Sequence, residues 1–192
     1  MNTNDKRYIK NEKLIRDTFM GILSEKKFSE ITIAELCEKC LISKTTFYSH
    51  YENIDDLLLK LISELLEGMK PDYRRLIIES SKQSDNALYK ITDFTIEYVN
   101  KNLSLFKIFF KHDLEIGFSN RFALALKNNS PLDYRNSELE ARIVSDFGLM
   151  GSIYAIKAWV LNSEKMDAQA VKNLIFPLQS ASVVQLCKFG KS

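Results

Sequence analysis

The sequence predicts an all-α protein, and three observations support this fold class. The chain of 192 residues contains only 6 Gly and 3 Pro, too few turn residues for a fold built from many short strands. Apolar residues recur at helical spacing in one segment after another. No segment keeps the strict alternation of apolar and polar residues that is typical of a half-buried strand. Together these patterns predict about nine helices in two domains.

The N-terminal part of the chain predicts three helices that include a helix-turn-helix. A polar arm is expected over residues 1–10, followed by a helix that ends near Glu25. Thr32 and Glu35 form a capping box for a second, short helix, and Ser43 caps a third helix over residues 43–50. The turn between the two short helices consists of three residues. The apolar stripe of the first helix is Ile15, Phe19, Ile22 and Leu23.

The remainder of the chain is predicted to form a larger helical domain. Asn53 caps a strongly amphipathic helix, which Gly68 and Pro71 are expected to end. Further helices are expected near residues 72–81, 85–101, 103–112, 115–128, 137–162 and 168–188. The predicted organisation is a helix-turn-helix domain over 1–52, a connecting helix over 53–70 and a second helical domain over 71–192.

The composition excludes several classes of protein. Hydrophobic residues make up 45% of the chain and charged residues 27%, which is ordinary for a soluble globular protein. No signal peptide is expected, because residues 1–13 are polar and charged. No membrane-spanning helix is expected either, since the most apolar segment, 147–161, is short and contains Lys157. We therefore expect a cytoplasmic protein.

Two groups of residues resemble parts of a metal site or an active site, but the further residues that such a site needs are missing from the sequence around them. Cys37 and Cys40 form a C-x-x-C, but no second ligand pair at zinc spacing follows. Packing on a buried helix face and a redox or metal role both stay open for these cysteines. His112 and Asp113 have no nucleophile at matched spacing and no Gly-rich phosphate loop, so a helix-end polar contact is the alternative to an acid/base site. No enzyme activity, cofactor or metal is expected.

Residues 43–50 combine hydroxyls, a lysine and a histidine on a segment that propensity alone would not make helical. On a helix, Phe47 and Tyr51 would face inward. The outward side chains would be Lys44, Thr45, Tyr48 and Ser49, with Thr46 and His50 on the flanks. Such groups can bond phosphates or base edges in the DNA major groove, and about 12 Å of helix fits a groove about 12 Å wide. A solvated polar helix face is the alternative.

The preceding capped helix and the three-residue turn favour contact with DNA over a solvated face, and the distribution of charge is compatible with it. The whole chain carries a formal net charge of only +2, so any contact with a polyanion must come from a local surface. Residues 1–50 contain nine Lys and Arg against seven Asp and Glu, whereas residues 51–68 contain one against five. The basic surface is therefore confined to the first three predicted helices.

Residues 15–58 resemble the DNA-binding domain of TetR-type (TetR/AcrR) transcriptional regulators. The resemblance rests on I-T-I-A-E-L at 31–36, I-S-K-T-T-F-Y at 42–48 and Y-x-x-x-x-x-L-L at 51–58. The T-F-Y triplet, with Gly148, Gly151 and Trp159 in a G-x-x-G-x-x-x-x-x-x-x-W pattern, is similar to the subgroup common in low-GC Gram-positive bacteria.

The resemblance implies a repressor that binds a palindromic operator in double-stranded DNA as a homodimer. Together with the outward positions above, it gives as DNA-binding residues Thr32, Ser43, Lys44, Thr45, Thr46, Tyr48, Ser49 and His50. Two residues depart from the family pattern. Leu41 replaces the usual Gly of the turn, at a cost of ~1 kcal/mol of strain or a changed turn. Ile54 replaces a Lys and removes one phosphate contact, which predicts weaker binding.

The C-terminal helices offer a dimerisation surface. Apolar residues cover most of the helix circumference over 147–161, and small residues permit close helix approach. The resemblance implies that two helices from each subunit form a four-helix interface, and packing within one chain is the alternative. The predicted dimerisation residues are Gly148, Gly151, Ile153, Leu178 and Ala181.

The middle of the chain is rich in aromatic residues at helical spacing. In the family this region surrounds a cavity for an inducer, so the resemblance implies an apolar small-molecule effector; a plain hydrophobic core is the alternative. The candidate effector-binding residues are Phe94, Tyr98, Phe106, Phe109, Phe110, Phe122 and Trp159. A second interpretation keeps the fold but drops the small molecule, and makes the protein a helical protein-interaction module or co-regulator.

Overall fold

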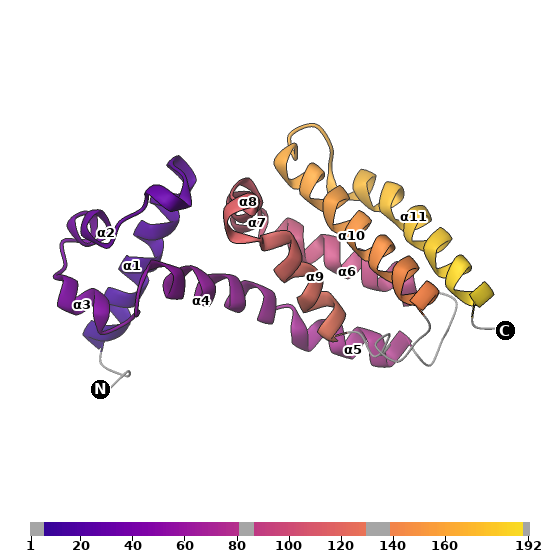
Figure 1. Ribbon diagram of the computed structural model, residues 1–192, viewed down its shortest axis with the longest axis horizontal. Helices are drawn as coiled ribbons and strands as arrows, with labels where there is room; N and C mark the ends of the chain where they lie inside the picture. Colours follow the sequence, from indigo (N-terminus) through magenta and orange to yellow (C-terminus); the bar gives the residue numbers. More distant parts are fainter. Residues whose placement is uncertain (1–5, 81–86, 130–138, 190–192) are drawn as a thin grey trace. The chain divides into compact units, whose positions relative to one another are not determined.

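The computed structural model describes residues 6–80, 87–129 and 139–189, and all regular structure within these ranges is helical (Figure 1). The α-helices are α1 (Lys6–Glu25), α2 (Ile33–Cys40), α3 (Lys44–Tyr48), α4 (Ile54–Glu67), α5 (Lys70–Ser80), α6 (Ala87–Lys101), α7 (Leu103–Lys111), α8 (Asp113–Ile116), α9 (Phe118–Asn129), α10 (Leu139–Leu161) and α11 (Ala168–Phe189). A short 3₁₀ helix covers Phe28–Glu30. The all-α prediction is confirmed.

The chain divides into two compact units. Unit 1 consists of Met1–Leu65 and Leu114–Ile116, and unit 2 of Leu66–Asp113 and Gly117–Ser192. The short second piece groups with unit 1 because Glu115 accepts hydrogen bonds from the Phe28 amide and the Ser29 hydroxyl, each at 2.9 Å. The boundary between the units falls within α4, inside the segment that the sequence predicts as the connecting helix.

Unit 1 is held together by the apolar faces that the sequence predicts. All four residues of the α1 stripe are buried, and the side chains of Leu36, Phe47 and Leu57 from the next three helices have no exposed surface. Asn53 caps α4 as expected, since its side chain accepts from the Asp56 amide at 2.8 Å. This core fixes the short helices α2 and α3 against α1.

Two predicted boundaries in the chain are wrong, each for a local reason. The first helix begins at Lys6 rather than after residue 10, and its first turn is packed because Tyr8 stacks on the His50 ring. The helix expected over 115–128 is divided, because Gly117 adopts a left-handed conformation with φ of 62° between α8 and α9. The helix after Asn53 ends at Glu67, just before Gly68 as predicted, and Pro71 lies in the first turn of α5, where its missing N–H costs no hydrogen bond.

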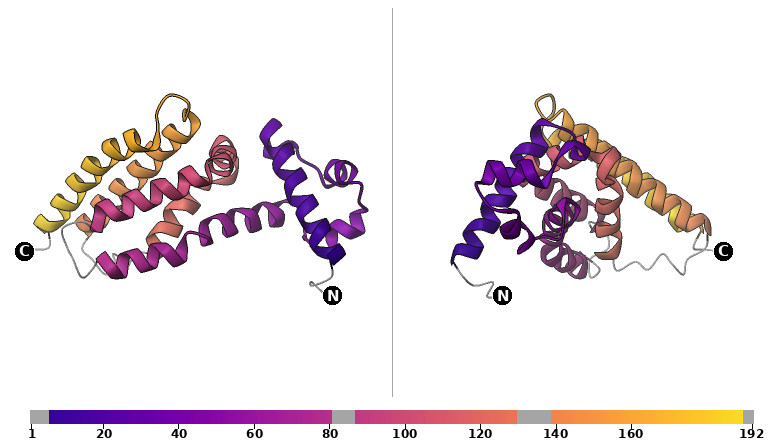
Figure 2. Two further views of the ribbon diagram at one scale, coloured as in Figure 1. Left: turned by 180° about the vertical axis from the view of Figure 1, so that it is seen from behind. Right: turned by 60° about the vertical axis from the view of Figure 1, so that its left-hand side comes forward.

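In unit 2, α10 and α11 lie side by side, as the views of Figure 2 show. Polar contacts fix the register of α11 against its neighbours. The buried Lys172 pairs with Asp93 at 2.7 Å and also with Glu97, and Gln179 donates to the Ser152 hydroxyl at 3.0 Å. Buried polar groups of this kind favour one packing arrangement, because any shift would leave them without partners.

One segment of α10 is longer and more apolar than the sequence suggested. Arg142–Leu161 reaches the length and apolar character of a membrane-crossing helix, although only 28% of this segment's most apolar stretch is buried within the chain. It also carries Asp146, which bonds Lys127 at 2.6 Å, and Lys157, which bonds Asp113 at 2.6 Å. Such ion pairs and the hydrogen bonds of Ser152 favour a bundle helix over a membrane span.

Candidate nucleic-acid interface

The recognition element of the predicted helix-turn-helix is α3, a helix of only five residues. The Ser43 hydroxyl caps it by accepting from the Thr46 amide at 3.0 Å, and it lies 2.9 Å from the Thr46 hydroxyl. The Ser49 hydroxyl donates to the Thr46 carbonyl at 2.7 Å. Three of the predicted DNA-binding hydroxyls therefore already make local hydrogen bonds that shape the helix ends.

Three of the predicted DNA-binding side chains are held outward. Lys44, Thr45 and Tyr48 are exposed, and Tyr48 is 56% accessible. Their side chains have no polar partner among the described residues. Phe47 anchors the opposite face of the helix with no exposed surface, and its ring lies 5.9 Å from that of the buried Tyr51. This arrangement presents one cation and two hydroxyls from a fixed helix.

Thr32 lies exposed at the start of α2, where its hydroxyl accepts from the Glu35 amide at 3.2 Å. Glu35 does not complete the expected capping box, because the contacts of its carboxylate among the described residues do not include the Thr32 amide. Its carboxylate instead pairs with Lys26 and, at 3.6 Å, with Lys39. Because Lys26 follows α1, this ion pair ties α1 to α2.

The turn between α2 and α3 keeps the geometry that usually requires glycine. Leu41 has φ of 53° and ψ of 41°, the left-handed conformation, and is the one non-glycine residue with positive φ in the described ranges. Its amide bonds the Glu38 carbonyl at 3.1 Å, and the Ile42 amide bonds the Cys37 carbonyl at 3.0 Å. This is a Schellman ending. The side chain of Leu41 is 93% exposed, so packing in the isolated chain does not offset the strain.

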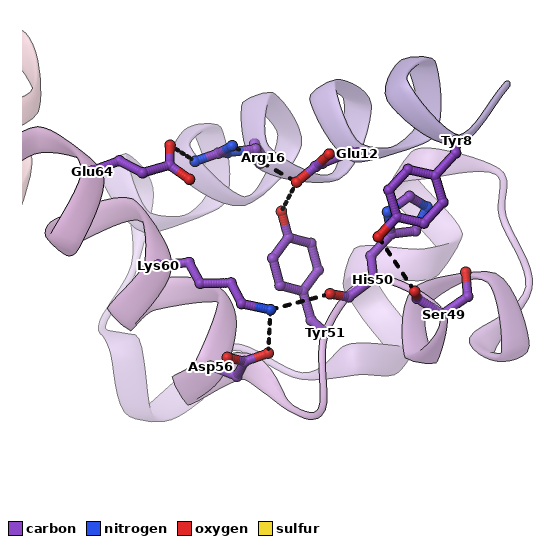
Figure 3. A network of polar contacts seen from close by, with 9 residues as sticks. All are labelled: Tyr8, Glu12, Arg16, Ser49, His50, Tyr51, Asp56, Lys60 and Glu64. Carbon is purple, nitrogen blue, oxygen red and sulfur yellow. Dashed lines mark hydrogen bonds and ion pairs between the residues drawn. The ribbon is translucent and has the colours of Figure 1, made fainter. Parts of the chain in front are cut away.

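His50 differs from the other predicted contact residues because the structure buries it. Its ring stacks on that of Tyr8 with 3.9 Å between centroids, and its Nδ1 has no hydrogen-bond partner (Figure 3). Burial lowers the pKa of His50 below its ordinary value, and nearby Lys60 acts in the same direction while Glu12 opposes it. A neutral, enclosed imidazole suits the interior of unit 1 better than a phosphate contact.

Around His50 the structure brings together residues that sequence reasoning missed (Figure 3). Lys60 bonds the His50 carbonyl at 3.3 Å and the Asp56 carboxylate at 3.0 Å, and Arg16 pairs with Glu64. The only available signal was the i, i+4 spacing of Asp56 and Lys60, which reads as an ordinary helix pair. Ile54, at the family's lysine position, is 9% exposed and belongs to the core.

Cys37 and Cys40 are both free thiols and both buried in unit 1. Burial raises the pKa of the Cys37 thiol, which disfavours the reactive thiolate. The described residues contain no group of three or more His, Cys, Asp and Glu side chains that could hold a metal ion. The packing interpretation of the C-x-x-C accounts for this geometry.

The three-dimensional arrangement is shared with solved structures. A TetR transcriptional regulator from Streptococcus agalactiae 2603V superposes with a TM-score of 0.70 over 92% of this chain and 97% of that one, at 19% identity. The chain has the fold of a TetR-type transcriptional regulator. The dihydroxyacetone kinase operon activator DhaS also shares this fold, with a TM-score of 0.52, 16% identity, and coverage of 94% and 98%.

Two curated proteins are similar in sequence, although no family model matches the chain. An uncharacterized HTH-type transcriptional regulator, YxbF of Bacillus subtilis (strain 168), is 34% identical over 59 residues, which is 30% of this chain. One of Haemophilus influenzae (strain ATCC 51907 / DSM 11121 / KW20 / Rd) is 24% identical over 98 residues, half of this chain. The matches span 16% and 46% of these relatives. The low-GC Gram-positive subgroup stays a prediction.

Within the TetR-type fold, the predicted effector residues form a packed core. The rings of Phe106, Phe109, Phe110, Phe118 and Phe122, which we call the aromatic cluster, are all at most 1% exposed. Neighbouring rings in it lie 4.9 to 6.5 Å apart, as between Phe110 and Phe118 and between Phe110 and Phe122. Phe94 and Tyr98 continue this row, since Tyr98 lies 6.4 Å from Phe106. Ring faces and edges fill this region.

The seventh predicted effector residue, Trp159, lies apart from the aromatic cluster. It borders a surface pocket of about 470 Å³, and its indole N–H donates to the Met166 carbonyl at 2.9 Å. The other lining residues are Glu97, Asn100, Leu103, Ser163, Asp167, Ala168 and Gln169. The lining is therefore mixed, with two carboxylates and no basic residue.

Asp113, which the sequence pairs with His112 as an acid/base candidate, makes structural contacts. Asp113 accepts from the Ser119 amide and hydroxyl, each at 2.6 Å, and from Lys157. Burial alone would raise the pKa of Asp113, but these hydrogen bonds lower it. His112 is buried, and Glu115 accepts hydrogen bonds from Phe28 and Ser29 within unit 1. These contacts orient chain segments and do not assemble an acid/base pair.

The predicted dimerisation residues fall into two groups. Gly151 and Leu178 are exposed, while Gly148 is half-buried and Ile153 is fully buried in unit 2. The side chain of Ala181 lies outside the described residues. An exposed apolar stripe runs along α10, and its large members are Leu139, Ile143, Phe147 and Tyr154. On α11, Leu174 and Leu178 are exposed as well.

Proposed function

We propose that this protein is a cytoplasmic transcriptional regulator that binds a palindromic operator in double-stranded DNA as a homodimer. The observation that carries the proposal is the exposure of Lys44, Thr45 and Tyr48 on a helix whose other face is pinned by Phe47. The contact surface of each subunit consists of these three side chains and the capping residues Thr32, Ser43, Thr46 and Ser49. His50 supports this surface from behind.

The dimer would form through α10 and α11. Six large apolar side chains on the described parts of these helices are exposed, among them Phe147 at 77%. Gly151 lies in the same stripe, and a Cβ added to it would meet no atom within 4 Å, so packing within the described chain does not require glycine there. Glycine inside a helix costs about 0.5–1 kcal/mol. Close approach of a second copy is a reason to retain it, and pairing would place two α3 helices on one duplex, where half-sites lie about 34 Å apart.

The regulator would respond to a small molecule bound beside Trp159. The aromatic cluster is filled by its own rings, so the pocket lined by Trp159, Glu97 and Asp167 is the better candidate for the effector. Its mixed lining fits a compact molecule with apolar and hydrogen-bonding groups, rather than the wholly apolar effector that the sequence suggests. We propose repression as the sign of regulation, although DhaS is named an activator.

DNA binding is tested by selecting duplexes from a random-sequence pool with the full-length protein. We expect an inverted repeat to be recovered, and its affinity to fall steeply between about 50 mM and 200 mM salt. Gel shifts at these two salt concentrations would measure it. No sequence-specific retention at the lower concentration would reject the operator and favour a protein-interaction module.

The dimer is tested with a matched pair of substitutions, because Leu174 on α11 and Leu124 on α9 are both 56% exposed. Leu174→Glu should shift the sedimentation equilibrium to monomer, since a charge would be buried at the interface. Leu124→Glu should leave the dimer unchanged. If both variants showed the same monomer–dimer equilibrium, this interface would be rejected.

The effector site has a built-in reporter, because Trp159 is the only tryptophan of the chain. A compound that enters the pocket should change the fluorescence of Trp159 and the affinity for the selected duplex together. A compound that changes DNA affinity without altering this fluorescence would place the effector elsewhere.

A further inference from the structure

We propose that Tyr8 and Lys60 are positioning residues that hold the C-terminal end of α3 from two sides. We call this pair the α3 clamp. The inference rests on the proposed function, because it assigns to two residues outside the contact surface a role in DNA recognition. Neither residue belongs to the motifs that carry the family resemblance.

The clamp is needed because α3 is too short to be stable alone. Isolated helices of fewer than about 12 residues are marginal in water, and α3 has five. Its first turn is capped by Ser43, and at the other end the amides of Ser49, His50 and Tyr51 bond the last carbonyls of α3. The carbonyls of Ser49 and His50 themselves lie just beyond the helix. Small rotations at that end would move Tyr48, the last residue of α3, relative to a phosphate.

Lys60 approaches this end from α4. Its ammonium donates to the His50 carbonyl at 3.3 Å and to Asp56 at 3.0 Å, and it lies 4.9 Å from the centroid of the Tyr51 ring (Figure 3). Asp56 also accepts from the Glu52 amide at 3.0 Å. The segment that joins α3 to α4 is therefore bonded to the first turns of α4 at two points.

Tyr8 approaches from α1. Its ring stacks on the His50 imidazole at 3.9 Å with 30° between the planes, and its hydroxyl lies 3.5 Å from the Ser49 carbonyl (Figure 3). The stack is the stronger contact, since the hydrogen bond is long. Through these contacts His50, directly after the C-cap of α3, is enclosed by Tyr8 on one side and fixed by Lys60 on its carbonyl.

The two carbonyls that the clamp bonds are adjacent in sequence, and they belong to Ser49 and His50. They lie at the end of α3 opposite the Ser43 cap, so cap and clamp together define the orientation of the helix. Ser43 sets where the helix begins, and the clamp sets where its last turn lies against α1 and α4. Loss of the clamp should loosen α3 while Phe47 keeps unit 1 folded.

The clamp is tested first without DNA. In the full chain, Lys60→Met keeps the stem that packs near Tyr51 but removes the donor, and Tyr8→Ala removes the stack. Each should raise hydrogen exchange at the Phe47 and Tyr48 amides about tenfold, while amides of α1 near Phe19 stay unchanged. Tyr8→Phe keeps the stack, so its exchange rate in α3 should lie between the rates of Tyr8→Ala and the wild type. Unchanged exchange in α3 would overturn the proposal.

The second measurement asks whether Lys60 positions α3 or touches phosphate itself. A positioning role predicts that Lys60→Met weakens binding to the selected duplex about tenfold, with binding to random duplex and the slope of log K against log salt unchanged. Lys60→Arg should restore specific binding, because it keeps a donor. Lys13→Met removes the same charge from exposed α1 and serves as the control.

A salt slope that falls by about 0.9 in Lys60→Met would make Lys60 a phosphate contact and overturn the positioning role. The two failures can be told apart. A wild-type protein that retains no duplex rejects the proposed function, while the exchange measurement still decides whether Tyr8 and Lys60 hold α3. The clamp alone is rejected if the wild type binds the selected duplex specifically and the variants show the same affinity and the same hydrogen-exchange rates in α3.

Discussion

The surface of α3 and the aromatic cluster of unit 2 are both marked by the sequence as candidate sites, but their side chains are placed in opposite ways. On α3 one large residue, Phe47, is buried, and Lys44, Thr45 and Tyr48 point outward. In the aromatic cluster all five rings are buried against one another. The first arrangement leaves hydrogen-bonding groups for a partner, and the second leaves no surface for one.

The comparison shows which sequence signals separate a site from a core. Burial of the rings against one another is enough to explain a stripe of Phe at helical spacing, so no ligand is required. Hydroxyls and a lysine on a short helix gain nothing from burial, and Ser, Thr and Tyr are mediocre helix formers, so their presence on α3 requires another reason. The contact with DNA that we propose would supply that reason.

The largest expected effect comes from breaking the aromatic cluster. Phe118 has no exposed surface, and its ring lies 4.9 to 6.3 Å from those of four other Phe residues. Phe118→Ala should lower the free energy of unfolding by about 3–5 kcal/mol, through lost burial and the cavity left behind. Urea unfolding followed by Trp159 fluorescence would measure it.

Leu124→Ala on the same helix is the control, since Leu124 is exposed and its loss should cost less than about 0.5 kcal/mol. A cost for Phe118→Ala as small as that of the control would mean that the rings line a loose cavity. The contrast between the cluster and α3 would then disappear, and the cluster would return as an effector site.

The next effect concerns α3 itself. Lys44→Ala should weaken binding to the selected duplex by about 1–3 kcal/mol and lower the salt slope by about 1, because one phosphate or base contact is lost. The stability of unit 1 should not fall, since Ala is the best helix former and Lys44 is exposed.

Lys90→Ala on α6 removes the same charge from an exposed position of unit 2 and should leave DNA affinity unchanged. Fluorescence anisotropy with a labelled duplex would follow both variants. If Lys44→Ala and Lys90→Ala had the same DNA affinity, the exposed side chains of α3 would be an ordinary solvated helix face.

Much of the fold could be predicted because its signals are local. The caps Thr32, Ser43 and Asn53 and the stripe from Ile15 to Leu23 specify the first helices without reference to distant residues. The site was harder to predict because it depends on contacts distant in sequence. His50 looks like a surface residue until Tyr8, 42 positions earlier, encloses it.

The same reasoning applies to the effector residues, which stay a prediction. Aromatic spacing predicts that rings share a helix face, but not whether that face meets a cavity or other rings. The pocket beside Trp159 draws its lining from α6, α7, α10 and the start of α11, so no single segment signals it. Sequence patterns of one helix cannot report how four helices meet.

A smaller effect is expected at the turn before α3. Leu41→Gly should raise the free energy of unfolding by about 1 kcal/mol, because glycine adopts φ of 53° without the strain of a Cβ. Leu41→Ala is the matched control: it removes the exposed side chain but keeps the Cβ, so stability should not change. Urea unfolding followed by far-UV circular dichroism would compare them. A gain in both variants would assign the effect to loss of exposed apolar surface.

The smallest effect is the pH dependence that His50 gives to unit 1. Because burial lowers its pKa below the ordinary value of about 6.5, the unfolded chain binds more protons just below pH 6.5. The stability contributed by neutral His50 is therefore complete above about pH 6.5 and is lost as the pH falls through the folded pKa. His50→Phe keeps a ring beside Tyr8 but cannot titrate.

Hydrogen exchange of the Phe47 and Tyr48 amides, corrected for the intrinsic effect of pH, would isolate this contribution from the carboxylates of unit 2. In the wild type, protection should decrease as the pH falls below about 6.5, and the His50→Phe variant should show a flatter profile. Protonation of His50 would place a positive charge in a buried site near the Lys60 ammonium, which bonds the His50 carbonyl, and this is why the loss should appear first in α3. Parallel profiles would show that His50 keeps its ordinary affinity for protons and that the Tyr8 stack does not exclude water from it.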